Sequence, residues 1–300
     1  MEELKNIPIY KDGRATLYDL YEGFEDLMRK FGWEKEIIYK IKIEGVEVPV
    51  YSFLSPVQGK SFWLLTGIHG EEPSGPNAVY RNINSIGELG RTIPMVIMPL
   101  LNPAGYYRNW RFHDVERSIE RLNVTDCRHL IARTDDPTKP ILDKPIHEIA
   151  DTFTKYVLDL LKRYPPLVYF DLHEDELLTG GYVYSQGELE GNDPVAQKTV
   201  ELLVSEKMPL KMSGPTRFAG EIITDGLVTD PDGKRVRDGS IDEFIANETY
   251  FDEDRNIVGK PFARTSIVTE TPAGEGFSLE DRIRAQEAIV KHLSELWKMA

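Results

Sequence analysis

The stretch FWLLTGIHGEE, residues 62–72, combines a buried strand with a polar turn. Its first five residues are apolar except for a β-branched threonine, which is typical of a strand covered on both faces of a sheet. Glycines within the turn permit a tight backbone, and His69 and Glu72 lie in it. Ligand sites of α/β sheets lie at the carboxyl ends of their strands, so we expect chemistry here.

Three further apolar runs repeat this pattern along the chain. Residues 93–98, 167–172 and 266–269 are short buried strands, and apolar residues recur at helical spacing over 145–164 and from Ser278 onward. Short strands that alternate with helices indicate a sheet covered on both faces. The predicted fold class is therefore α/β, with a mixed, largely parallel twisted sheet and helices on both faces.

Two segments depart from the pattern of this core. Residues 1–55 combine helical spacing over 15–31 with two alternating strands around a Glu-Gly turn. We expect them to form a helix and hairpin extension that packs on the catalytic domain, residues 56–300. Residues 212–260 are rich in glycine and aspartate and have few long apolar runs, which predicts an inserted hairpin or lid.

The composition of the 300-residue chain excludes several classes of protein. Fifty acidic against 36 basic residues give a formal charge of −14, which argues against binding to nucleic acid or an anionic membrane. The single cysteine, Cys127, excludes an intrachain disulfide framework and a multi-cysteine metal site. The N-terminal stretch MEELKNIPIY has acidic residues where a signal peptide needs a basic region, and no apolar region follows it, so a cytoplasmic protein is expected.

His69 and Glu72 have a spacing at which an imidazole nitrogen and a carboxylate oxygen can converge on one ion. Such a pair by itself is more often a capped turn with solvated acids. His173, however, ends a second apolar strand, and two histidines with one glutamate form a catalytic zinc set that leaves one position open to water. We therefore expect one Zn²⁺ per chain. The other four histidines are interpreted as structural or surface residues: His113, His129, His147 and His292.

Two further segments could supply catalytic groups. Glu270 ends the apolar strand at 266–269, where burial would favour acid–base chemistry and a nearby metal would oppose that effect. It could move a proton from a metal-activated water to a leaving amine; the alternative is a strand-end salt bridge. The segment NPAGYYRNWR, residues 102–111, also follows a buried strand. Its arginines could hold a substrate carboxylate or polarise a carbonyl, although such a string is more often a solvated loop.

The strings HGEE, NPAGY with RNWR, DLH and TETP, in this order, resemble the zinc carboxypeptidase family of metallopeptidases. They are also similar to its relatives, the succinylglutamate desuccinylases and aspartoacylases. The resemblance spans about residues 62–274. It implies that His69, Glu72 and His173 bind zinc. It further implies that Glu270 is the general base and acid, and that Arg111 stabilises the oxyanion.

The sequence departs from the family at the Asn-Arg pair that grips the substrate's terminal carboxylate. The best positional match is Asp126-Cys127-Arg128, in which cysteine replaces asparagine, and Arg128 is the expected substrate ligand. Arg121 and Asn123 are competing candidates. Asp126 is either a partner that orients a zinc-bound histidine or a surface acid.

Two more residues are expected to contact the substrate. Asn102 begins the NPAGY string, and Tyr250 lies about twenty residues before Glu270, where the family has a tyrosine that closes over the substrate. Tyr250 could equally be a core or lid residue of the segment 212–260.

The expected function is zinc-dependent hydrolysis of an amide bond by a carboxypeptidase-like metallopeptidase, with a peptide as substrate. The alternative is an N-acyl amino acid deacylase that uses the same metal set. Deacylases of that type often carry a C-terminal β-rich domain, whereas a helical pattern ends this sequence, which favours the peptidase. A third reading, a metal-binding protein without catalysis, leaves Glu270 unexplained.

Overall fold

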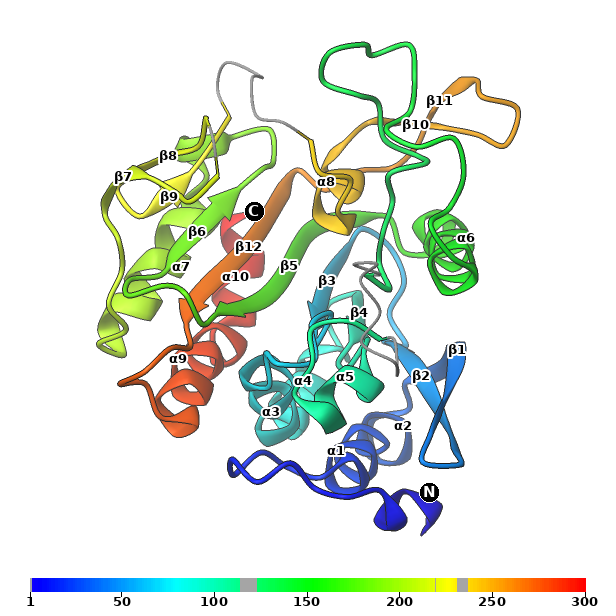
Figure 1. Cartoon of the computed structure of the whole chain (residues 1–300), viewed down its shortest axis with the longest axis vertical. Helices are drawn as coiled ribbons and strands as arrows, with labels where there is room; N and C mark the ends of the chain where they lie inside the picture. Colours follow the sequence, from blue (N-terminus) through cyan, green and yellow to red (C-terminus); the bar gives the residue numbers. More distant parts are fainter. Residues whose placement is uncertain (1, 114–122, 219, 231–236) are drawn as a thin grey trace.

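A computed structural model of the chain describes residues 2–113, 123–218, 220–230 and 237–300. Within them lies a ten-stranded sheet of strand order β1-β2-β4-β3-β5-β12-β6-β9-β8-β7 (Figure 1). Its centre is parallel and consists of β4 (Met95–Met98), β3 (Ser61–Thr66), β5 (Pro166–Asp175) and β12 (Thr265–Pro272). These are the four strands predicted from the apolar runs, and the predicted α/β fold class is confirmed.

Shorter or antiparallel strands extend the sheet on both sides of this centre. On one side, the hairpin of β1 (Glu34–Ile43) and β2 (Val46–Leu54) pairs with β4. On the other side, β6 (Tyr182–Ser185) runs antiparallel to β12. Beyond β6 lie three short strands: β9 (Leu227–Val228), β8 (Ile222–Thr224) and β7 (Ser213–Pro215).

The N-terminal segment, residues 1–55, is more closely integrated than the sequence predicts. Its hairpin does not pack on the sheet as an extension but forms an edge of it, because the buried Phe53 and Leu54 pair with β4. The preceding η1 (Glu2–Asn6), α1 (Leu17–Phe24) and α2 (Asp26–Phe31) share the hydrophobic core of the main sheet.

Helices cover both faces of the sheet because successive residues of its central strands point to opposite sides. Phe62 and Leu64 of β3 belong to one core cluster, and Trp63 and Leu65 belong to the other. The first face is covered by α3 (Ser74–Arg81), α4 (Ile83–Leu89), α5 (Pro103–Arg108), α7 (Pro194–Ser205), α9 (Leu279–Lys291) and α10 (Leu293–Met299). The second face is covered by α6 (Glu148–Arg163) and α8 (Ile241–Ala246). Among the described helices, none has the length and apolarity needed to cross a membrane.

The segment 212–260 is not a single hairpin or lid. Its described parts are the strands β7 to β9, the helix α8 and a separate hairpin of β10 (Thr249–Phe251) and β11 (Ile257–Gly259). The helix buries Ile241, Phe244 and Ile245 against the sheet. Three apolar residues on one short helix make no long run in the sequence, which is why the composition underestimates how well this segment is packed.

Candidate metal centre and active site

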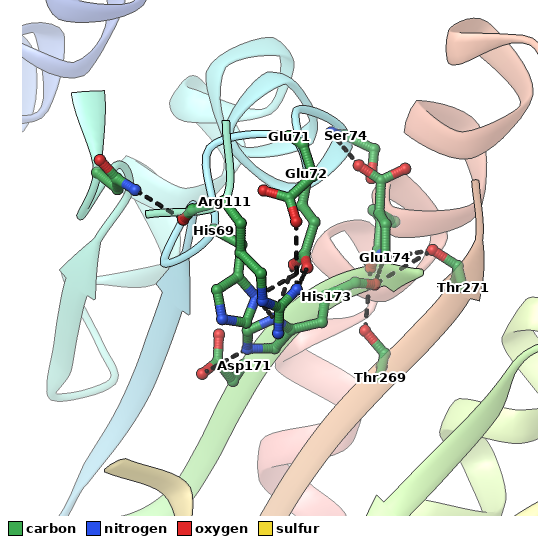
Figure 2. Close-up of polar contacts among 12 residues, drawn as sticks. His69, Glu71, Glu72, Ser74, Arg111, Asp171, His173, Glu174, Thr269 and Thr271 are labelled. Carbon is green, nitrogen blue, oxygen red and sulfur yellow. Dashed lines mark hydrogen bonds and ion pairs between the residues drawn. The ribbon is translucent and has the colours of Figure 1, made fainter. Parts of the chain in front are cut away.

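The three predicted metal ligands meet at the carboxyl edge of the central strands (Figure 2). His69 and Glu72 lie in the turn between β3 and α3, and His173 lies on β5, the neighbouring strand. One ligand atom from each side chain lies within 4.8 Å of the others, and all three residues are buried. The fold therefore brings together residues that are about a hundred positions apart in the chain.

The carboxylate of Glu72 lies between the two imidazole rings. Its Oε1 is 2.8 Å from Nδ1 of His69, and its Oε2 is 2.7 Å from Nδ1 of His173. The two Nδ1 atoms are themselves 3.1 Å apart. Two imidazole nitrogens and a carboxylate thus face one point, and this donor set fits a zinc ion.

Close backbone packing holds the ligand turn in place. Gly67 has a φ of +64°, in the left-handed region that favours glycine. A Cβ on Gly70 would lie only 1.9 Å from the backbone of Gly105 in α5. The HGEE and NPAGY strings are therefore in direct contact, and this contact requires glycine at position 70, whereas a Cβ on Gly105 would lie 2.3 Å from the carbonyl oxygen of Trp110.

Asp171 orients the ring of His173 from behind. Its Oδ2 is 3.0 Å from Nε2 of His173, and the hydroxyl of Tyr169 donates to the same oxygen at 3.1 Å. A carboxylate on Nε2 leaves Nδ1 as the nitrogen that faces a metal. From the sequence, Asp126 was one candidate for such a role, but Asp126 instead pairs with Arg128 at 2.6 Å. The DLH string could have indicated Asp171, because it lies two residues before His173 and residues two apart on a strand have side chains on the same face.

Replacing Asp171 by asparagine is expected to weaken zinc binding by about 10- to 100-fold, the usual effect of losing such a partner of a metal-bound histidine. Competition with a chromophoric chelator would measure the affinity. Asp135→Asn is the matched control, because Asp135 is exposed and pairs with Arg133. Equal affinities of the two variants would show that Asp171 does not orient the ligand.

Burial and charge oppose each other in this cluster. Burial lowers the pKa of His69 to about 4. Burial acts the same way on His173, but the carboxylates of Asp171 and Glu72 outweigh it and raise its pKa well above the ordinary value. Burial would raise the pKa of Glu72, yet the two imidazoles hold it well below normal. The cluster thus presents an ionised carboxylate beside a neutral His69, and a metal would displace the proton of His173.

The predicted catalytic residues lie next to the ligands. Glu270 on β12 is the register partner of His173 on β5. Burial raises the pKa of Glu270 to about 8; the charge of His173 lowers this pKa and that of Glu72 raises it. A divalent cation nearby would lower the pKa of Glu270. Nη1 of Arg111 is 3.1 Å from Glu72 and 3.2 Å from Glu71. A carboxyl group and a guanidinium therefore flank the candidate metal position.

These groups share one cavity of about 410 Å³. Its wall includes Arg111, Asp171, Glu270 and the ligands His69 and His173. The segment 212–260 contributes to the same wall through the β7–β8 connection, with Arg217, Phe218 and Glu221, and through α8. The prediction that this segment lies over the site thus has structural support, although Tyr250 is not the residue that it contributes.

Tyr250 lies on β10 and does not line this cavity. Its ring packs edge-on against Phe244, with 6.2 Å between the centroids, and it lines a separate cavity with His129 and Asp252. Pairing with Val258 fixes its position in the β10–β11 hairpin. Tyr250 is therefore a partly buried residue of the outer hairpin, which is the other interpretation offered by the sequence.

Asn102 is not exposed to the cavity either. Its Oδ1 accepts a hydrogen bond from the Gly105 amide at 2.8 Å and caps α5, and its Nδ2 donates to the carbonyl of Arg111 at 3.0 Å. Both ends of the amide are used and the residue is buried. Asn102 therefore positions the Arg111 segment instead of contacting substrate.

The expected carboxylate ligand, Arg128, is paired with a neighbouring carboxylate. Its Nε donates to Asp126 at 2.6 Å, and Arg128 is not part of the cavity wall. Of the competing candidates, Asn123 lines the cavity, and Arg121 lies outside the described residues. The structure thus brings the predicted metal ligands, Glu270 and Arg111 together, but not Arg128, Asn102 or Tyr250.

The interactions that fix β5 from its other face were not anticipated from the sequence. Glu174 accepts a hydrogen bond from the Ser74 amide at 2.8 Å and pairs with Arg282 at 2.9 Å. Gln286 of α9 donates to the carbonyl of His173 at 3.1 Å. These contacts anchor both the start of α3 and the strand that carries His173, so the ligand side chains are held from two directions.

Neither a protein-family model nor a curated protein matches the sequence. Solved structures, in contrast, share its fold. A proposed metallopeptidase from Shewanella baltica superposes with a TM-score of 0.71 at 20% identity, covering 94% of this chain and 91% of that one. Bovine thrombin-activatable fibrinolysis inhibitor, solved with tick carboxypeptidase inhibitor, gives 0.58 at 14% identity, covering 95% and 98%.

A metallo-carboxypeptidase from Burkholderia cenocepacia gives a TM-score of 0.53 at 14% identity, covering 94% of this chain and 70% of that one. The chain therefore has the fold of a class of metallopeptidases that includes the carboxypeptidases. This confirms the fold that the resemblance of the four sequence strings implied.

Proposed function

We propose that this protein is a zinc-dependent amide hydrolase of the carboxypeptidase type. The observation that carries the proposal is the convergence of His69, Glu72 and His173 within 4.8 Å, with Glu270 as the register partner of His173. A metal-binding protein without catalysis would not need a partly buried carboxyl group at that position, because removing an ionisable group from water is costly.

Each residue has a role that follows from its place in the cavity. A zinc ion held by His69, Glu72 and His173 would supply Lewis acidity, which acidifies water and polarises a carbonyl. Glu270, as a carboxylate, accepts the proton of the attacking water and returns it to the departing amine. Arg111 donates to the oxygen on which negative charge develops.

A deacylase remains the second candidate, for a specific reason. The same residues would cleave an N-acyl amino acid, and Arg128, the expected ligand for a peptide's terminal carboxylate, is bound to Asp126. The cavity of about 410 Å³ is large enough for either a dipeptide end or a small N-acyl amino acid.

Hydrolysis assays on the zinc-loaded protein would separate the two. We expect release of the C-terminal residue from N-acetylated dipeptides. Removing the metal with a chelator should abolish this release, and adding zinc should restore it. Cleavage of N-acetyl and N-succinyl amino acids without cleavage of the dipeptides would identify a deacylase. The absence of metal-dependent hydrolysis from the whole panel would contradict both.

A further inference from the structure

The electrostatic character of the cavity wall restricts where a substrate carboxylate can bind. Of the described residues that line it, two are arginines, Arg111 and Arg217. Acidic residues dominate the rest: Asp126, Asp171, Glu221, Asp238, Asp242, Glu243 and Glu270. A carboxylate would be repelled over most of this wall and stabilised only beside a guanidinium. Arg111 is already engaged at the metal position by Glu71 and Glu72.

Arg217 is fixed relative to the metal ligands through Asp175. Its Nη1 lies 2.5 Å from Oδ2 of Asp175, which belongs to β5 and is nearly fully buried. Asp175 follows His173 by two residues and so lies on the same face of the strand, about 7 Å further along. The pairing with Asp175 thereby holds the guanidinium of Arg217 beyond His173 along β5, in the cavity that His173 and Glu270 also line.

The connection that carries Arg217 is itself anchored to the sheet. Glu221 accepts hydrogen bonds from Tyr184 of β6 at 2.9 Å and from Thr216 at 2.7 Å. Arg217 also stacks on Phe218, with 4.9 Å from its guanidinium carbon to the ring centroid. These contacts hold Glu221 against β6 and place the guanidinium of Arg217 beside the ring of Phe218.

Arg217 retains donors for a ligand. An arginine carries five N–H groups, and the side chain is 38% exposed, so the pairing with Asp175 leaves part of the guanidinium open to the cavity. The charge of Arg217 also partly offsets the rise to about 12 that burial causes in the pKa of Tyr182, which lies on β6.

We propose that Arg217 binds a carboxylate group of the substrate and takes the place of the expected ligand Arg128. This inference rests on the proposed hydrolase function, and it makes Arg217 a specificity-determining residue. The carboxylate could belong to the leaving amino acid or to the acyl group, and both have the same chemistry at a guanidinium.

Kinetics on matched substrates would identify the carboxylate. The acids and C-terminal amides of N-acetylated dipeptides test the leaving side, and N-succinyl against N-acetyl amino acids test the acyl side. We expect the wild type to prefer one carboxylate-bearing substrate about 10- to 100-fold, and Arg217→Gln to abolish that preference mainly through KM. Arg217→Lys should restore part of it, while Arg133→Gln, at an exposed position away from the cavity, should leave it intact.

Binding provides a readout that does not depend on turnover. In a zinc-loaded Glu270→Gln background, calorimetry would compare the acid and amide forms of the same compounds with and without Arg217→Gln. Stronger binding of the acid that disappears with Arg217→Gln supports the proposal even if the wild type hydrolyses none of the panel. A preference that survives Arg217→Gln but is lost in Arg128→Gln, or no preference at all, would overturn it.

Discussion

Replacing Glu270 by glutamine is expected to lower turnover by about 10²- to 10⁴-fold, the usual contribution of a positioned general acid–base group. Glutamine keeps the size of the side chain but cannot accept a proton. Zinc occupancy should stay close to that of the wild type, because Glu270 is the strand neighbour of His173 and does not belong to the ligand group. Elemental analysis and kcat on the best substrate would measure the two properties on the same preparation.

Glu253→Gln is the matched control for this variant, since Glu253 is exposed on the outer β10–β11 hairpin. It should retain full turnover and full zinc. If Glu270→Gln were as active as this control, Glu270 would be a structural acid and another group would have to move the proton. If it lost zinc together with activity, its role would lie in the metal site.

Removing either histidine ligand should have the largest effect on the metal. The apparent free energy of zinc binding is about 10–16 kcal/mol for structural four-ligand sites in zinc-finger peptides. Losing one ligand is therefore expected to weaken binding by about 10²-fold or more. His69→Ala and His173→Ala are the direct tests, with zinc measured after dialysis against a weak chelator. Hydrolysis should fall in parallel with metal content.

His292→Ala serves as the control, because His292 lies between α9 and α10 and bonds to the carbonyl of Ala288. His173→Ala also leaves two buried carboxylates without their imidazole, which is costly. The variant His69→Gln is therefore measured as well. Thermal unfolding curves of all these variants then distinguish loss of metal from loss of the fold. Full zinc in both folded histidine variants would refute the ligand assignment.

The central strands of the fold could be predicted because buried strands consist of apolar residues. The four parallel strands are covered on both faces, so each appears in the sequence as a short continuous apolar run. The short strands beyond β6 leave a weaker pattern in the sequence. β7, β8 and β9 are only two or three residues long, and their pairing depends on partners distant in the chain.

The residues of the candidate site also fall into those that the sequence predicts and those that it does not. His69, Glu72, His173 and Glu270 each stand at the end of an apolar run, and parallel strands bring their carboxyl ends to one edge. Residues placed by loops were assigned less well. Tyr250 and Arg128 occupy positions in the sequence that resemble the family's substrate contacts, yet Tyr250 pairs within the β10–β11 hairpin and Arg128 pairs with Asp126, and neither lines the cavity.

By itself, the sequence determined the central strands, the order of the ligand-bearing turns and the chemistry of the donor set, because these depend on local burial and on residue type. Only the tertiary structure decided which carboxylate orients His173, that the β1–β2 hairpin forms an edge of the sheet, and that Arg217 lines the cavity. Those features depend on contacts between segments far apart in the chain. Such contacts are determined by packing and strand pairing, and they produce no periodic pattern of apolar and polar residues in the sequence.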